Sequence, residues 1–306
     1  MQQVNIGIFH DDSLAKSLGK KATESDMVLF HRKTDDQIFT FAYSVEDKII
    51  PKSQIINMID VAIISAEEIT PALGETILML DSVGINKGII ITQPYADNTQ
   101  LEKMIQGTTL SSFHMMTRDV HQIMEILQKQ TITKEDDAPV AVTIDHSFHV
   151  KGVGDVILGF INQGIVRKHD KLMLHPLDKQ ITVRSIQMQD NDVEAASGGS
   201  RVGLAVKGAS VDDLNRGYIL SNPESTLTSQ ECKLSFNQNP FYPNVSVGKY
   251  HVTVGLQTVP IEISEIKDSS IIITTDKPIS YLSHQHFLFL DLNAEKLHHM
   301  GTGKLR

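Results

Sequence analysis

The sequence contains no tryptophan, one cysteine and no long apolar run. A single cysteine excludes an internal disulfide framework and a zinc site built from several cysteines, so Cys232 is expected to be a small buried apolar side chain. No run approaches the roughly 18 to 20 apolar residues that span a bilayer. The first residues also lack the basic start and long apolar stretch of a signal peptide. We therefore expect a cytoplasmic protein without a membrane segment.

Basic charge is also scarce. The chain has 28 Lys and Arg against 37 Asp and Glu, a net charge of -9, and most of the excess lies in the first 135 residues. Proteins that bind nucleic acid without specificity neutralise phosphates with clustered Lys and Arg, so any RNA contact here must be local. With 41% hydrophobic and 21% charged residues, the composition is that of a globular chain, and 306 residues suffice for two or three domains.

The first 130 residues alternate short apolar runs with helical patterns. This alternation predicts a mostly parallel α/β sheet. Residues 61–65 and 88–92 are continuous apolar runs, typical of strands buried on both faces, and Thr70 followed by Pro71 is a typical helix start. The expected strands are 4–9, 27–31, 38–43, 61–65, 88–92 and 112–116, and the expected helices are 13–20, 52–58, 71–82, 98–105 and 118–129.

The pattern changes at residues 131–139, where dense charge followed by proline indicates a linker. After it, short alternating runs are separated by Gly, Asn and Asp, which predicts all-β barrels. Residues 221–225 interrupt this part once, before expected strands at 232–236, 248–256, 261–266, 271–275 and 287–291. The predicted domains are therefore an α/β domain over residues 1–134 and two β-barrels over residues 138–222 and 225–306.

Residues 142–164 read VTIDHSFHVKGVGDVILGFINQG, and related patterns continue through residue 220. This string resembles the second domain of translational GTPases, with elongation factor Tu and SelB, particularly archaeal forms, the most similar. The third part resembles the third barrel of that family more weakly, through residues 248–254, 276–278 and 287–303. The resemblance implies a G-domain-like α/β sheet followed by two β-barrels.

The G domain of that family binds GTP, but its nucleotide motifs are missing here. A phosphate loop needs G-x-x-x-x-G-K-[ST], whereas residues 9–17 read FHDDSLAKS. Both glycines are absent, Asp11 and Asp12 place negative charge where phosphate would lie, and Lys16 and Ser17 are the only remnant. The D-x-x-G position near residues 43–48 has no glycine, TQPY at 92–95 replaces N-K-x-D, and residues 21–27 leave hardly any room for the first switch.

Losing all these contacts predicts a pseudo-GTPase with no catalytic residues, no cofactor and no metal. Three histidine pairs have spacings that could chelate zinc, but no Cys or acidic cluster accompanies them. These pairs are 146/149, 284/286 and 298/299.

The resemblance also implies a second-domain pocket for the 3' aminoacyl end of tRNA. By position, its acidic residue, its phenylalanine and its basic residue match Asp145, Phe148 and Lys207. An aromatic face can stack an adenine and a cation can meet phosphate, although Lys207 lacks the planar fork of the family's arginine. Alternatively, Phe148 is an ordinary core aromatic and Lys207 an exposed turn residue. Lys151 and Arg216 complete the RNA-binding candidates.

Six cations of this domain form either a basic face for ribosomal RNA or scattered solvated charges. They are Arg167, Lys168, Lys171, Arg184, Arg201 and Arg216.

The leading hypothesis is a non-catalytic elongation factor Tu/SelB-like protein that binds the tRNA acceptor end or the ribosome without a GTP cycle. One alternative is a protein-interaction adaptor or regulator of the translation machinery that binds no RNA, which the negative charge favours. Another is a residual GTP-binding translation elongation factor. The oligomeric state stays open.

Overall fold

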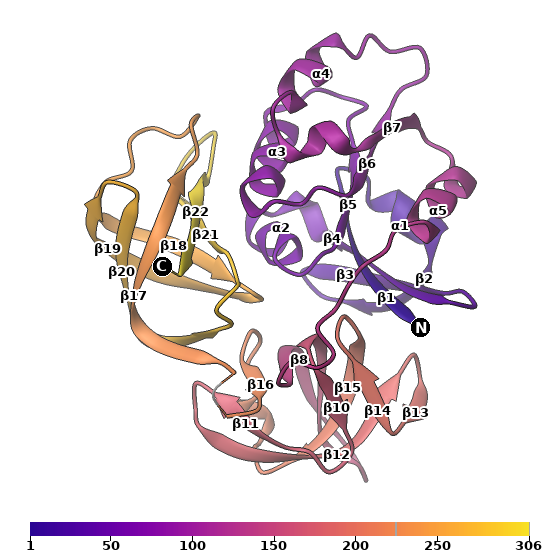
Figure 1. Cartoon of the computed structure of the whole chain (residues 1–306), viewed down its shortest axis with the longest axis vertical. Coiled ribbons are helices and arrows are strands. Elements are labelled where there is room, and N and C mark those ends of the chain that lie inside the picture. Colours follow the sequence, from indigo (N-terminus) through magenta and orange to yellow (C-terminus); the bar gives the residue numbers. More distant parts are fainter. Residues whose placement is uncertain (224, 306) are drawn as a thin grey trace.

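The computed structural model describes residues 1–223 and 225–305, which form an α/β unit and two β-barrels (Figure 1). The predicted fold class is confirmed. Glu224 of the predicted interruption at 221–225 and Arg306 of the second predicted barrel lie outside the described residues. Within the described residues, no helix is both long and apolar enough to cross a membrane.

The first unit contains one seven-stranded sheet. Its strands are β1 (Gln2–Phe9), β2 (Lys20–Glu24), β3 (Met27–Lys33), β4 (Gln37–Ser44), β5 (Val61–Ser65), β6 (Gly88–Thr92) and β7 (His114–Thr117). They lie in the order β2-β3-β4-β1-β5-β6-β7, and pairing is parallel from β4 through β7. β3 pairs antiparallel with β4 and with β2, so these strands form an antiparallel ribbon at the sheet edge.

Helices cover both faces of this sheet (Figure 1). They are α1 (Asp12–Leu18), α2 (Ile49–Ile56), α3 (Pro71–Val83), α4 (Thr99–Ile105) and α5 (Val120–Gln128), with short 3-10 turns at Val45–Asp47 and Thr109–Ser112. Apolar side chains of α1 and α5 pack on one face, and those of α2, α3 and α4 pack on the other. Because a half-exposed helix must bury its apolar stripe, these two clusters hold the layers together.

Several predictions for the first unit were wrong. The expected helix at 52–58 lies at Ile49–Ile56, the expected helix at 13–20 ends at Leu18, and the expected helix at 118–129 begins at Val120. The expected strand at 112–116 begins two residues later, since Thr109–Ser112 forms a 3-10 turn. β2 was not predicted at all. Its sequence is KKATE and most of it is exposed, so it carries no apolar signal, and it exists because it pairs with the apolar strand β3.

The second unit is a barrel closed by pairing of β11 with β12. Its elements are β8 (Ala141–Val150), β9 (Gly154–Gln163), β10 (Ile165–Arg167), β11 (Lys171–His175), β12 (Lys179–Met188), β13 (Asn191–Val193), β14 (Ala195–Ser197), β15 (Arg201–Lys207), a 3-10 turn at Val211–Asp213 and β16 (Ile219–Ser221). The barrel order is β11-β16-β8-β9-β15-β12. Gly159 permits the close approach of β8 and β9, because a Cβ there would lie 2.6 Å from the carbonyl oxygen of Thr143.

The third unit is a closed barrel in the order β17-β20-β19-β18-β21-β22. Its strands are β17 (Leu227–Gln238), β18 (Gly248–Val254), β19 (Gln257–Lys267), β20 (Ser270–Tyr281), β21 (Phe287–Leu290) and β22 (His299–Leu305). Cys232 is buried in the core of this barrel, as predicted. β22 was not among the expected strands. Its two glycines, at 301 and 303, weaken the strand pattern.

The three units share buried surface. Phe160 of the second unit and Leu256, Leu288 and Leu290 of the third belong to the same apolar cluster as α2 and α3. Ala141 and Ile219 of the second unit pack with Leu282 of the third in a smaller cluster. Each unit therefore has apolar contacts with both others. In Figure 1 the three units lie in a triangular arrangement.

The predicted linker is held against the first two units. Lys134 Nζ lies 2.5 Å from Asp60 Oδ1, and the Asp60 carboxylate also accepts the backbone N–H of Asn5 at 3.0 Å. Asp136 accepts the backbone N–H of Gly198 at 3.2 Å. These contacts fix where the chain enters the first barrel.

Candidate functional site

The loop after β1 lies at the carboxyl end of the parallel strands, the edge where open α/β sheets bind ligands. Asp11 is the N-cap of α1, and its Oδ1 accepts the backbone N–H of Leu14 at 3.1 Å. Its Oδ2 lies 2.9 Å from Arg118 Nη1. The free N–H groups that begin a helix attract anions, and here a carboxylate of the chain itself meets one of them.

The two remnants of a phosphate-loop motif lie beyond this cap. Lys16 is exposed in the last turn of α1. Ser17 Oγ donates to the carbonyl oxygen of Leu14 at 2.7 Å, so its hydroxyl is bonded within the helix.

A polar cluster lies beside the same loop. His10 Nε2 is 2.9 Å from Thr76 Oγ1, and Lys52 Nζ is 2.8 Å from Asp47 Oδ2. Asp47 Oδ2 also lies 3.5 Å from His10 Nδ1. Burial lowers the pKa of His10, against the opposing charge of Asp47. These four side chains come from the loop after β1, the turn after β4, α2 and α3, so they bond the elements around the loop to one another.

The other two nucleotide-motif positions form ordinary turns. Glu46 and Asp47, in the 3-10 turn after β4, both have positive φ. Tyr95, after β6, has a φ of 61 and is fully exposed. Asp97 accepts the backbone N–H and the hydroxyl of Thr99, at 3.0 and 2.6 Å, and so stabilises the turn before α4.

Asp145 lies in an ion cluster between the β2–β3 hairpin and the first barrel, which we call the hairpin–barrel cluster (Thr23, Asp26, Asp145, Arg201 and Arg216). A bulge in β8 occurs at Asp145, and bulges redirect side chains. The residue is only 2% exposed. Its Oδ2 lies 3.1 Å from Arg201 Nη2, and its Oδ1 lies 3.7 Å from Arg216 Nε.

The same two arginines reach the hairpin. Arg216 Nη1 donates to Asp26 Oδ1 and Oδ2, at 2.7 and 2.9 Å, and Arg201 Nη2 donates to Thr23 Oγ1 at 3.1 Å. Burial opposes the ionisation of Asp26, but its bonds to Arg216 hold its pKa below the ordinary value. Burial also opposes the ionisation of Asp145, yet His146, Arg201 and Arg216 hold its pKa low as well. Both carboxylates are therefore charged partners of the arginines at neutral pH.

The remaining RNA-binding candidates lie at one end of the barrel. Phe148 is 41% exposed, so the alternative that it is an ordinary core aromatic is wrong. Lys151 lies in the β8–β9 turn, and Lys207 is the exposed last residue of β15. The strand register places Val150 opposite Gly154, and Asp155 opposite Val206, so both lysines lie near this turn. The structure thus brings Asp145 and Arg216 together and leaves Phe148, Lys151 and Lys207 on the exposed end.

The six cations of the predicted basic face fall into two groups, those in ion pairs and those without. Lys168 Nζ pairs with Glu194 at 2.6 Å, and Arg201 and Arg216 belong to the hairpin–barrel cluster. Arg167, Lys171 and Arg184 form no ion pair with the described residues. Three of the six cations are therefore already neutralised.

The histidine pairs have local roles. Burial lowers the pKa of His299 to about 3 and that of His286 to about 4. His298 Nδ1 lies 3.4 Å from Glu75 Oε2, and His149 Nδ1 lies 2.8 Å from Asp155 Oδ1. Among residues 1–223 and 225–305 there is no group of three or more His, Cys, Asp and Glu side chains placed to hold a metal ion.

Sequence reasoning missed Thr23 and Asp26. Both lie in or beside β2, whose sequence gave no strand signal. Without that hairpin, nothing along the chain indicates that Asp26 meets Arg216, which lies 190 residues further on.

Comparisons with known proteins agree with this architecture. The family model for elongation factor Tu domain 2 matches residues 154–221. Uncharacterized protein MJ0325 of Methanocaldococcus jannaschii is 38% identical over 310 residues, covering all of both chains. The selenocysteine-specific elongation factor of the same organism is 32% identical over 149 residues. The chain belongs to the translational GTPase family.

The share of each relative that this chain covers differs between the matches. The match to the selenocysteine-specific factor covers 48% of this chain and 32% of the factor. The crystal structure of SelB from Methanococcus maripaludis with the GTP analogue GppNHp has a TM-score of 0.86 and 21% identity, and the match covers 100% of this chain and 79% of that one. The translation elongation factor-like fold is therefore present over the whole described chain.

Proposed function

We propose that this family member binds the tRNA acceptor end or the ribosome without a GTP cycle. The observation that carries the proposal is the Asp11 carboxylate at the start of α1. A phosphate group at that position would meet a like charge that is already bonded to Leu14 and Arg118. Like charges at close range cost free energy, and one of the helix N–H groups that would offset this cost is already bonded.

The hairpin–barrel cluster also supports the proposal that the protein has no GTP cycle. A GTP-driven switch needs an element whose order depends on the γ-phosphate. Here the short β2–β3 hairpin is fixed by its own pairs, Asp26 with Arg216 and Thr23 with Arg201. No nucleotide is needed to place the hairpin against the barrel.

Calorimetry tests the nucleotide part of the proposal. GTP and GDP are titrated with Mg²⁺ into the full chain, with a GTP-binding SelB as positive control. We expect no heat of binding up to millimolar nucleotide. A dissociation constant in the micromolar range or below would instead support the residual GTP-binding elongation factor.

Sedimentation tests the RNA part. A tagged copy in native-cell lysate is run through a sucrose gradient at low and moderate salt, and copurifying RNA is sequenced. Movement with ribosomes indicates a factor-site binder, and enriched tRNA indicates an acceptor-end carrier. Phe148, Lys151 and Lys207 are accessible for either contact, Arg216 is 25% exposed, and Asp145 becomes accessible only if the hairpin moves away.

The net charge of -9 favours a second candidate, an adaptor that binds a protein of the translation machinery and no RNA. Charge reversal at Lys151 and Lys207 separates the two. RNA or ribosome binding would fall with both substitutions and with salt, whereas a protein partner bound elsewhere would be retained.

A further inference from the structure

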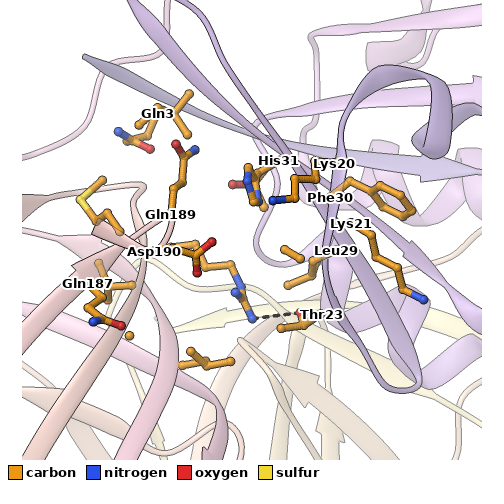
Figure 2. Close-up of a pocket in the computed structure, with 18 residues that line it drawn as sticks. Gln3, Lys20, Lys21, Thr23, Leu29, Phe30, His31, Gln187, Gln189 and Asp190 are labelled. Carbon is orange, nitrogen blue, oxygen red and sulfur yellow. Dashed lines mark hydrogen bonds between the residues drawn. The ribbon is translucent and has the colours of Figure 1, made fainter. Parts of the chain in front are cut away.

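A cavity lies between the ribbon at the sheet edge and the first barrel (Figure 2). Its volume is about 270 Å³. Lys20 and His31 line it from the β2–β3 ribbon, and Gln187, Gln189 and Asp190 line it from the β12–β13 hairpin. In Figure 2, Lys20 and His31 lie on one side, and Gln189 and Asp190 lie on the other.

The wall of this cavity combines apolar and amide groups. Leu29, Phe30 and Leu158 contribute apolar surface, and Gln3 adds a third amide to those of Gln187 and Gln189. Of the residues that line it, Gln189 Nε2 and Arg201 Nε are buried and have no hydrogen-bond partner within the described chain. A cavity with apolar walls and a few polar groups is the usual form of a small-ligand site.

A shallow basic groove of about 520 Å³, widely open to solvent, continues from this cavity along the ribbon. It shares Lys20, His31, Gln189 and Asp190 with the cavity and adds Arg32 and Lys33. Register pairing places Lys20 directly opposite His31. Lys20, Arg32 and Lys33 are exposed and form no ion pair with any described residue, and Asp190 is the only acidic residue lining the groove.

Three cations without an ion pair among the described residues line this one groove. Lys21 pairs with Glu24 on the same ribbon, yet its neighbour Lys20 and the two cations of β3 have no such partner. Like charges gathered on one surface repel one another and oppose folding. In a chain with a net charge of -9, such a cluster is best explained by an anionic partner.

We propose that this groove and cavity bind a single-stranded RNA segment, with phosphates along Lys20, Arg32 and Lys33 and one base in the cavity. This inference rests on the proposed function, because it assumes that the protein contacts RNA. The groove supplies cations for the backbone, and the cavity supplies amides and apolar surface for a base. An acidic peptide or inorganic polyphosphate would use the cations but gain nothing from the cavity.

The first experiment measures fluorescence anisotropy with a labelled 12-nucleotide oligoadenylate and the full chain. The triple variant K20A/R32A/K33A is compared with K103A/K129A/K277A, whose three lysines are also exposed and outside ion pairs in the described chain. We expect the first variant to bind at least about tenfold more weakly and the control to stay within about twofold. Each single-stranded phosphate contact contributes about 0.7 to the salt slope, so the slope should fall by about 2.

The second variant tests the cavity. Gly203 lines it, and an added Cβ would make only ordinary contacts, the nearest being 3.5 Å from Leu158. Gly203→Val should fill part of the cavity and weaken oligoadenylate binding, while inorganic polyphosphate binds as before and the salt slope is unchanged. Circular dichroism and thermal melting check that each variant is folded.

If K20A/R32A/K33A bound oligoadenylate as tightly as the wild type, phosphate binding in the groove would be ruled out. If Gly203→Val bound oligoadenylate as tightly as the wild type, base binding in the cavity would be ruled out. If the wild type also sediments with ribosomes or tRNA in those cases, the proposed function stands without this site. If the wild type binds neither oligoadenylate nor ribosomes nor tRNA, both proposals fail.

Discussion

Arg216 holds both carboxylate oxygens of Asp26, at 2.7 and 2.9 Å, and thereby joins a hairpin of the first unit to the first barrel. Beneath this pair lies Asp145, which is within 4 Å of the same guanidinium and of Arg201. The outer carboxylate is half exposed and the inner one is buried. Their contributions to stability should therefore differ.

Replacing the inner carboxylate should cost more than replacing the outer one. Asp145→Ala leaves Arg201 buried beside no carboxylate, and removing one partner of a buried pair costs about 3–5 kcal/mol. Asp26→Ala removes an exposed pair, for which about 1 kcal/mol or less is expected. Urea unfolding measures both, with the exposed Asp276→Ala as control. Equal losses for the two would show that burial does not decide the effect.

Glu75 connects α3 to the third unit. Its Oε1 accepts the backbone N–H groups of His298 and His299, at 2.6 and 2.8 Å. Glu75→Ala should destabilise the protein, because each buried N–H left unsatisfied costs about 1–3 kcal/mol. Glu75→Gln keeps an acceptor and should lose less. Thermal melting compares the two, and a Gln variant as unstable as the Ala variant would contradict this role.

His299 should make stability depend on pH. It is fully buried and its pKa is lowered to about 3 from an ordinary 6.5. Above pH 6.5 neither the folded nor the unfolded state protonates it. Between pH 6.5 and 3 the unfolded state binds the proton and the folded state does not. The free energy of unfolding therefore decreases as the pH is lowered through this range. The loss should reach about 2 kcal/mol at pH 5.

Urea unfolding at pH 7 and pH 5 checks this dependence, with His299→Leu as the matched variant. The Leu variant should lose less stability between the two pH values than the wild type. His286, whose pKa is lowered to about 4, adds a loss in the same direction and of similar size in both proteins, since its pKa also lies below pH 5. An unchanged pH dependence in His299→Leu would rule out this histidine as a cause.

The three units should keep one relative orientation whether or not GTP is present. Contacts join every pair of units, including Ser53 Oγ with Thr253 Oγ1 at 2.8 Å and Asn5 Nδ2 with the carbonyl oxygen of Gly199 at 3.1 Å. Small-angle scattering should give superimposable curves with and without GTP and Mg²⁺. A change in the radius of gyration on adding GTP would contradict a fixed arrangement.

The sequence predicted the fold well where burial dominates. Strands such as Val61–Ser65 and Gly88–Thr92 are buried along their whole length, and their continuous apolar runs marked their exact bounds. The exposed strand Lys20–Glu24 has no such pattern and depends on a partner strand. Local periodicity cannot show such a dependence.

The candidate site was only partly predictable for a related reason. Asp145 and Phe148 were found from a resemblance that specifies residue types, but whether each side chain is buried depends on its surroundings. Asp145 is enclosed by Arg201 of β15 and by Arg216 of the turn before β16, whereas Phe148, three residues later, is exposed. The cations Lys20, Arg32 and Lys33 were overlooked because the overall charge is negative and their proximity depends on the pairing of two strands.

The apolar cluster that Phe160, Leu256 and Leu288 share with α2 and α3 has a consequence for how the protein unfolds. Separating either barrel from the first unit would expose part of that cluster to water, which costs free energy. We therefore expect the barrels and the α/β unit to unfold together. A truncated chain ending after the first unit would expose an apolar surface to water and tend to aggregate.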